Sequence, residues 1–242
     1  MDITTVLFDL DGTLLPMDQD AFTKGYFKLL AAKLAPHGYE PKQLIDAVWA
    51  GTAAMVMNDG LHSNETVFWE KFSKIYGERA LTDRPLFEHF YAEDFQAART
   101  ICGHNPKAAE MVKKLKALGY RVALATNPLF PAIATESRIR WAGLEPRDFE
   151  LYTTYENTSY CKPNTKYYID VAKKLNCDPK ECLMVGNDVS EDMVAETIGM
   201  RVFLLTDCII NKDNRDISSY PNGGFDELLR FVESMGASNF GI

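Results

Sequence analysis

The sequence has little cysteine, little positive charge and no long apolar run. Its 242 residues include only five cysteines. Their odd number and their scattered positions argue against a secreted disulfide framework and favour a reducing compartment. Lysine and arginine total 26 against 34 aspartates and glutamates, which gives a net charge of -8. That sign is wrong for a protein that neutralises many phosphates of nucleic acid or of anionic lipid, so we expect neither partner.

Membrane and targeting signals are also missing. No stretch approaches the roughly 18 consecutive apolar residues of a membrane span, and Met1–Thr5 has neither a basic region nor a cleavable apolar run. We therefore expect an untargeted, cytoplasmic protein with no membrane partner. The sequence leaves the oligomeric state open.

Short apolar runs rich in β-branched residues alternate with helix-length segments. The runs predict strands over residues 3–10, 121–126, 151–154, 182–186 and 201–205. Helical spacing predicts helices over residues 106–118, 130–141, 166–175, 191–198 and 226–235. This alternation, with strands apolar on both faces, predicts an α/β fold: a Rossmann-like, mainly parallel sheet with helices on both faces.

One region interrupts the alternation. Residues 16–99 show helical periodicity without a good strand and hold 13 of the 28 aromatic residues. A loop of that length and apolarity would be anomalous. We therefore predict two domains, with residues 1–15 and 100–242 forming the α/β core and residues 16–99 forming a small α-helical domain with its own core.

Two carboxylates end the first predicted strand. Asp9 and Asp11 are two residues apart, so both side chains can reach one locus at the carboxyl end of a parallel strand, where ligands bind in open α/β sheets. Clustered carboxylates repel unless a cation or a proton lies between them. The pair thus indicates either a hard divalent cation, with Mg²⁺ the natural candidate, or one protonated acid.

The segment Asp9–Leu14, which reads DLDGTL, resembles the first signature of the haloacid dehalogenase superfamily in its phosphatase form. The later signatures follow in order. Thr126 and Asn127 end the second strand, Lys162 precedes a proline, and an acidic cluster that contains Asp188 and Asp192 follows Gly186. The position of residues 16–99 is similar to that of the helical cap domain that this family places between its first two signatures.

The resemblance implies a mechanism and a set of roles. Asp9 would be the nucleophile, Asp11 the general acid and base, and Lys162 a catalytic cation that also binds phosphate. Thr126 and Asn127 would bind the phosphoryl group, and Asp9, Asp11 and Asp188 would hold Mg²⁺ with Asp192 in support. We therefore expect a Mg²⁺-dependent phosphatase that hydrolyses a small phosphorylated metabolite through an aspartyl-phosphate.

One departure from the family pattern concerns the fourth signature. It usually has an acid directly after its glycine, whereas Asn187 stands there in this chain and Asp188 follows. The sequence thus leaves open which of Asp188 and Asp192 ligates the metal directly.

Three alternative functions share this fold. A 2-haloacid dehalogenase needs neither Mg²⁺ nor an acid two residues after the nucleophile, so Asp11 argues against it. A phosphomutase needs the same four groups and would return the phosphoryl group to the substrate rather than to water. A non-catalytic binding module would be expected to have lost at least one of these groups, and the sequence retains them all.

Overall fold

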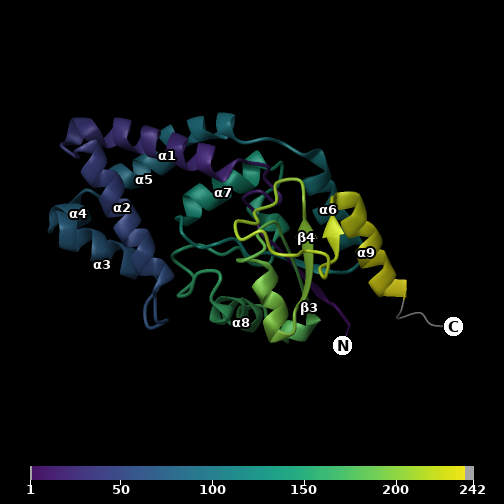
Figure 1. Ribbon diagram of the computed structural model, residues 1–242. Coiled ribbons are helices and arrows are strands. Elements are labelled where there is room, and N and C mark those ends of the chain that lie inside the picture. The colour runs from purple at the N-terminus through teal and green to yellow at the C-terminus, as the bar shows by residue number, and fades with distance from the viewer. Residues whose placement is uncertain (1, 238–242) are drawn as a thin grey trace.

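The computed structural model describes residues 2–237. These form a β-sheet flanked by helices, with a bundle of further helices beside it (Figure 1). The strands are β1 (Thr5–Phe8), β2 (Arg121–Leu124), β3 (Cys182–Gly186), β4 (Arg201–Leu205) and β5 (Asn222–Gly223). They pair in the order β2-β1-β3-β4-β5, and every pairing is parallel. The predicted α/β fold with a parallel sheet is confirmed.

Helices lie on both faces of the sheet and in a group beside it (Figure 1). The α-helices are α1 (Gln19–Leu34), α2 (Pro41–Val56), α3 (Asn64–Tyr76), α4 (Arg79–Thr82), α5 (Arg84–Ala92), α6 (Pro106–Ala117), α7 (Ala132–Trp141), α8 (Thr165–Lys174) and α9 (Phe225–Ala237). The 3-10 helices are η1 (Ala35–His37), η2 (Asp94–Ile101), η3 (Pro146–Asp148), η4 (Pro179–Glu181) and η5 (Met193–Ile198).

Alternate residues of each strand face opposite layers of the core. Val6 and Phe8 of β1 belong to a buried cluster with residues of α6, α7 and α9, whereas Leu7 belongs to a cluster with residues of α8 and η5. Successive side chains of a strand point to opposite faces, so a sheet covered on both sides needs apolar residues at every position. All four residues of β1 are buried, as that arrangement requires.

The helices from α1 to η2, which we call the inserted helices, lie between β1 and α6 in the chain and beside the sheet in space (Figure 1). Aromatic rings pack their interior, with Phe72 and Phe90 fully buried. Ring pairs such as Trp69 and Phe87, whose centroids are 5.4 Å apart at 89°, meet edge to face.

Asn64 at the start of α3 joins the inserted helices to the rest of the chain. Its backbone N–H donates to the carbonyl of Thr158 at 2.8 Å, and its buried side-chain amide donates to the carbonyl of Tyr160 at 3.4 Å. The side chain also accepts a hydrogen bond from Asn58 at 2.8 Å. The loop between α2 and α3 is therefore held against the segment that precedes α8.

Two predicted elements differ in the structure. Residues 151–154 form no strand: Tyr152 makes one isolated bridge to Leu124, and the segment then turns at Thr154, whose N–H binds the Asn157 side chain. The helix predicted over residues 191–198 is the 3-10 helix η5, which begins only at Met193. Its expected first turn is occupied by a loop whose N–H groups bind the Asp188 carboxylate instead. Within residues 2–237, no helix has the length and apolarity to cross a membrane.

Candidate active site

Asp9 and Asp11 lie where β1 leaves the sheet. The N–H of Asp9 still donates to the carbonyl of Val185 on β3 at 2.9 Å, which continues the parallel ladder by one residue. The chain then turns through Gly12, whose φ of +85° is in the left-handed region that glycine adopts without strain. Asp9 is buried, whereas the Asp11 side chain is 20% exposed.

Lys162 bridges two carboxylates beneath this turn. Its Nζ lies 2.8 Å from Oδ1 of Asp9 and 2.6 Å from Oδ1 of Asp192, and all three side chains are buried. Three groups that are far apart in the sequence thus form one ionic cluster at the carboxyl end of the sheet. Charge-assisted hydrogen bonds of this kind fix the lysine in one orientation.

Burial and charge act on these groups in opposite directions. Burial raises the pKa of Asp9 to about 7, with the Asp192 and Asp11 carboxylates also raising it and Lys162 opposing them. Burial lowers the pKa of Lys162, but Asp192 and Asp9 outweigh burial and hold that pKa well above its usual value. The two carboxylates therefore favour the charged form of Lys162, and the carboxylate form of Asp9 gains from any further positive charge placed beside it.

The end of β2 contributes Thr126 and Asn127. Thr126 is buried, and its carbonyl accepts hydrogen bonds from the hydroxyls of Thr153 at 2.7 Å and Tyr167 at 2.8 Å. The Asn127 side chain accepts from the N–H of Lys162 at 3.3 Å and donates to Oε2 of Glu191 at 3.0 Å. Asn127 therefore connects the lysine segment with the acidic loop after β3.

The acidic residues of that loop take different positions. Asp192 accepts from Lys162 through Oδ1 and from the N–H of Asp188 through Oδ2 at 2.9 Å. The Asp188 carboxylate accepts from the N–H groups of Ser190 at 2.7 Å and Glu191 at 2.9 Å, both through Oδ1. Asp192 thus positions the lysine, and Asp188 shapes the loop with one of its two oxygens.

Asn187 faces the turn after β1. Its Oδ1 accepts from the Thr13 hydroxyl at 3.0 Å, and its Nδ2 donates to the carbonyl of Cys208 at 2.7 Å. The same Thr13 hydroxyl lies 3.2 Å from Oδ2 of Asp9. A Cβ on Gly12 would come within 2.3 Å of the Asn187 amide, so this glycine permits the close approach.

Two residues that the sequence did not single out complete the site. Arg138 of α7, with 1% of its side chain exposed, donates to Oδ2 of Asp11 and lies 4.4 Å from the centroid of the Phe130 ring. Glu191 lies beside Asn127, and burial raises its pKa to about 7, with Lys162 lowering it and Asp192 raising it. Glu191 belongs to the recognised acidic cluster, whereas no local pattern marks Arg138.

The oxygen donors present are compatible with a hard divalent cation. Among residues 2–237, no three His, Cys, Asp or Glu side chains form a ready metal cluster. A cation would therefore need a backbone carbonyl in addition to carboxylates, which is a common ligand for Mg²⁺ or Ca²⁺. Oδ1 of Asp11 is buried and has no hydrogen-bond partner among the described residues, so the turn also keeps an unused oxygen.

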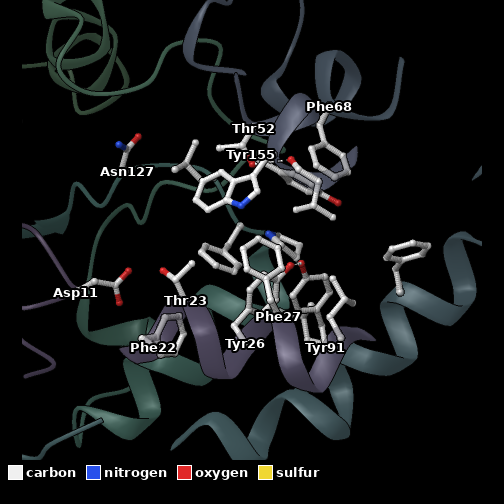
Figure 2. Close-up of a pocket in the computed structure, with 18 of the residues that line it drawn as sticks. Asp11, Phe22, Thr23, Tyr26, Phe27, Thr52, Phe68, Tyr91, Asn127 and Tyr155 are labelled. Carbon is white, nitrogen blue, oxygen red and sulfur yellow. Dashed lines mark hydrogen bonds between the residues drawn. The ribbon is translucent and has the colours of Figure 1, made fainter. Parts of the chain in front are cut away.

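A cavity of about 260 Å³ opens from this site toward the inserted helices. Asp11, Asn127 and Glu191 line it together with residues of α1, α2, α3 and α5. Figure 2 shows Asp11 and Asn127 on one side of the cavity and the rings of Phe22, Tyr26 and Phe27 beyond them.

A buried lysine, two neighbouring aspartates and a cavity meet at the carboxyl ends of the parallel strands, which is where enzymes with open α/β sheets place their active sites. The chain belongs to the haloacid dehalogenase-like hydrolase family, whose model matches residues 3–195. The resemblance noted in the sequence is thereby confirmed.

Individual relatives are distant. The pyrophosphatase PpaX of Bacillus cereus is 23% identical over 201 residues, which cover 83% of this chain and 82% of PpaX. A predicted phosphoglycolate phosphatase from Haemophilus somnus superposes with a TM-score of 0.59 at 19% identity, over 96% of this chain and 98% of that one. A 2-haloacid dehalogenase from Pseudomonas syringae gives 0.62 at 19% identity with the same coverage. These structures share the fold of the chain, and their reactions differ.

Proposed function

We propose that the protein is a Mg²⁺-dependent phosphatase that hydrolyses a small phosphate monoester through an aspartyl-phosphate on Asp9. The observation that carries this proposal is the buried contact of Lys162 with Asp9 and Asp192, placed beside Asp11 at the carboxyl end of β1. A dehalogenase has no need of the Asp11 carboxylate. The name of the PpaX relative also favours phosphorus over carbon as the atom attacked.

In the first step, a carboxylate oxygen of Asp9 attacks phosphorus in line, and the bond from phosphorus to the ester oxygen breaks. Asp11, protonated on Oδ1 once the substrate is bound, gives that proton to the ester oxygen, which leaves as an alcohol. Arg138 holds Oδ2 of Asp11, and this leaves Oδ1 for the proton transfer. The products of this step are the free alcohol and a phosphoryl group covalently bound to Asp9.

In the second step, the Asp11 carboxylate takes a proton from a water whose oxygen attacks the same phosphorus, and the bond to Asp9 breaks. Inorganic phosphate leaves, and both aspartates return to their starting protonation states. The Thr126 hydroxyl, the Asn127 amide and the Lys162 ammonium are the groups that would bind the equatorial phosphoryl oxygens in both steps.

Mg²⁺ held by the Asp9 carboxylate, the Asp11 backbone carbonyl and Asp188 would offset the repulsion between carboxylate and phosphate and stabilise transition-state charge. The raised pKa of Asp9 supports this assignment, because a carboxylate that burial disfavours gains most from a neighbouring cation. Asp192 is assigned to positioning Lys162.

We assign residues 16–99 to a cap domain and residues 1–15 and 100–242 to the core domain. The cavity shared by Asp11 and the inserted helices supports this assignment, because such a cap excludes bulk water and contacts the leaving group. The expected partner is thus a small phosphorylated metabolite, which would bind between the cap domain and the core domain.

The experiment is release of inorganic phosphate from 4-nitrophenyl phosphate, with Mg²⁺ or with a chelator, by the wild type and Asp9→Asn. We expect Mg²⁺-dependent release that the variant lacks. Asp46→Asn, which removes an exposed carboxylate of α2, is the matched control and keeps wild-type turnover. Equal turnover by Asp9→Asn would remove the nucleophile assignment, and absence of release by the wild type would favour a mutase or a non-catalytic module.

A further inference from the structure

The cavity beside Asp11 is lined mainly by aromatic rings. Phe22, Tyr26 and Phe27 come from α1, Trp49 from α2, and Phe68 and Trp69 from α3. In Figure 2 the rings of Phe22, Tyr26, Phe27 and Phe68 surround the space beyond Asp11 and Asn127. The catalytic end of the cavity is thus polar, and the end formed by the inserted helices is aromatic.

Several polar side chains among these rings already have hydrogen-bond partners within the protein. The hydroxyls of Tyr26 and Tyr91 lie 2.9 Å apart, and Nε1 of Trp69 donates to the hydroxyl of Tyr155 at 3.4 Å. The Thr52 hydroxyl donates to the carbonyl of Val48 at 2.9 Å. The Thr23 side chain also lines the cavity. A polar ligand group placed among the rings would find few hydrogen-bond partners in exchange for its water, whereas an apolar group needs none.

Charge around the cavity disfavours a second anionic group. Arg84 is the cationic side chain among the described lining residues, and its guanidinium is bound to Glu65 and lies 5.0 Å from the centroid of the Trp69 ring. Glu88 and Glu191 also line the cavity. A nucleotide or inorganic pyrophosphate would bring its additional charge to a region that holds no spare cation.

Building on the proposed phosphatase, we infer that its substrate is a phosphate monoester whose leaving group is an uncharged aromatic or similarly bulky apolar alcohol. The phosphate lies at Asp9, and the apolar group occupies the aromatic end of the cavity. A cavity of roughly 150 Å³ accommodates benzene, so about 260 Å³ holds a six-membered ring with substituents. Trp49, which is 51% exposed, also lines the aromatic end, so this end of the cavity lies at the protein surface.

The test compares esters with leaving groups of similar acidity, so that intrinsic reactivity does not decide the outcome. We expect kcat/KM for 2-phenylethyl phosphate to exceed that for ethyl phosphate by at least about tenfold, because an apolar pocket gains affinity with each buried carbon. Inorganic pyrophosphate, whose leaving group is charged, is expected to have a higher KM than 2-phenylethyl phosphate. Equal or better kcat/KM for ethyl phosphate, or a lower KM for pyrophosphate, would overturn the inference.

A matched pair of variants tests whether the preference for the phenylethyl ester arises in the cavity. Thr52→Trp fills the cavity from α2, whereas Ala53→Trp puts the same side chain on the exposed face of that helix. We expect Thr52→Trp to abolish most of the preference for the phenylethyl ester, mainly through a higher KM for that ester. Ala53→Trp is expected to keep the preference. Retention of the preference by Thr52→Trp would contradict the assignment.

A binding measurement separates this inference from the proposed function. Calorimetric titration with 2-naphthol, which has no phosphate, is expected to show saturable binding to the wild type and to Ala53→Trp, and none to Thr52→Trp. If no ester releases phosphate, the proposed reaction is wrong. The titration still tests whether the aromatic end of the cavity binds an apolar group. Absence of saturable 2-naphthol binding to the wild type would overturn the apolar subsite.

Discussion

Arg138 on α7 donates a hydrogen bond to the carboxylate of Asp11, although 127 residues separate the two in the chain. The guanidinium also donates to the carbonyl of Ala134 and to the hydroxyl of Thr135, both at 3.3 Å. These contacts, together with the Phe130 ring, fix its orientation. Arg138 is therefore a positioning residue for Asp11.

Arg138→Met is expected to destabilise the fold by about 2–4 kcal/mol, because it leaves the partly buried Asp11 carboxylate without its cation. Asp11→Asn should reduce this cost, so the double-mutant cycle is expected to give a coupling energy of about 1–3 kcal/mol. Urea denaturation measures both. Arg140→Met, at an exposed position on the same helix, is the control and should cost less than about 0.5 kcal/mol. Additive single effects would exclude the coupling.

The pH dependence of stability without divalent cations follows from Asp9 and Glu191, whose pKa values are both raised to about 7. A carboxyl with a raised pKa binds a proton more tightly in the folded than in the unfolded state. Its contribution to stability is fully present below its unfolded pKa and is lost as the pH rises through about 7.

Glu191→Gln isolates one of these two groups. Relative to this variant, the wild type is expected to lose stability as the pH increases from about 5 to about 8. The measurement is the midpoint of urea unfolding in the presence of a chelator, with the two proteins compared at each pH. Parallel pH profiles would show that Glu191 does not titrate as inferred.

Mg²⁺ is expected to raise the melting temperature more at about pH 8 than at about pH 5.5, because carboxylate ligands must lose their protons to bind a metal. Asp9→Asn should show a smaller shift than the wild type at the higher pH. Differential scanning fluorimetry with and without a chelator measures this shift without any turnover. A shift independent of pH and of Asp9 would contradict the assigned ligand set.

Asn187→Asp restores the acid that the family usually has after the glycine, and we expect it to destabilise this chain. The amide donates to the carbonyl of Cys208, so an aspartate would set two acceptors against each other at 2.7 Å. The expected loss is about 1–3 kcal/mol. Urea denaturation checks it, and a variant as stable as the wild type would show that this contact adds nothing.

Asn64→Ala removes the buried amide that holds α3 to the segment before α8. We expect a loss of about 1–3 kcal/mol, because the carbonyl of Tyr160 and the Asn58 amide would each lose a hydrogen bond to this buried side chain. If residues 16–99 act as a cap, KM should also increase while Asp9 remains intact. Gln43→Ala, at an exposed position of α2, is the control for both measurements.

Local patterns were sufficient for most of the sheet. The four apolar runs that became β1, β2, β3 and β4 were predicted, because a strand covered on both faces is apolar at every position. The run over residues 151–154 has a similar composition but lies at the edge beside β2, where it pairs through a single bridge. Composition cannot distinguish a strand from a segment that only touches the sheet edge.

The candidate site, like the sheet, was only partly predictable from the sequence. Asp9, Asp11, Thr126 and Lys162 could be predicted from the sequence, since each follows an apolar run or forms a recognisable signature. The sequence by itself thus determined the parallel α/β fold and the chemical groups at the strand ends. Only the tertiary structure decided that Arg138 holds Asp11 and that aromatic rings of α1 and α3 line the neighbouring cavity. Such contacts depend on how helices distant in the chain pack, and helical periodicity records only which face of each helix is buried.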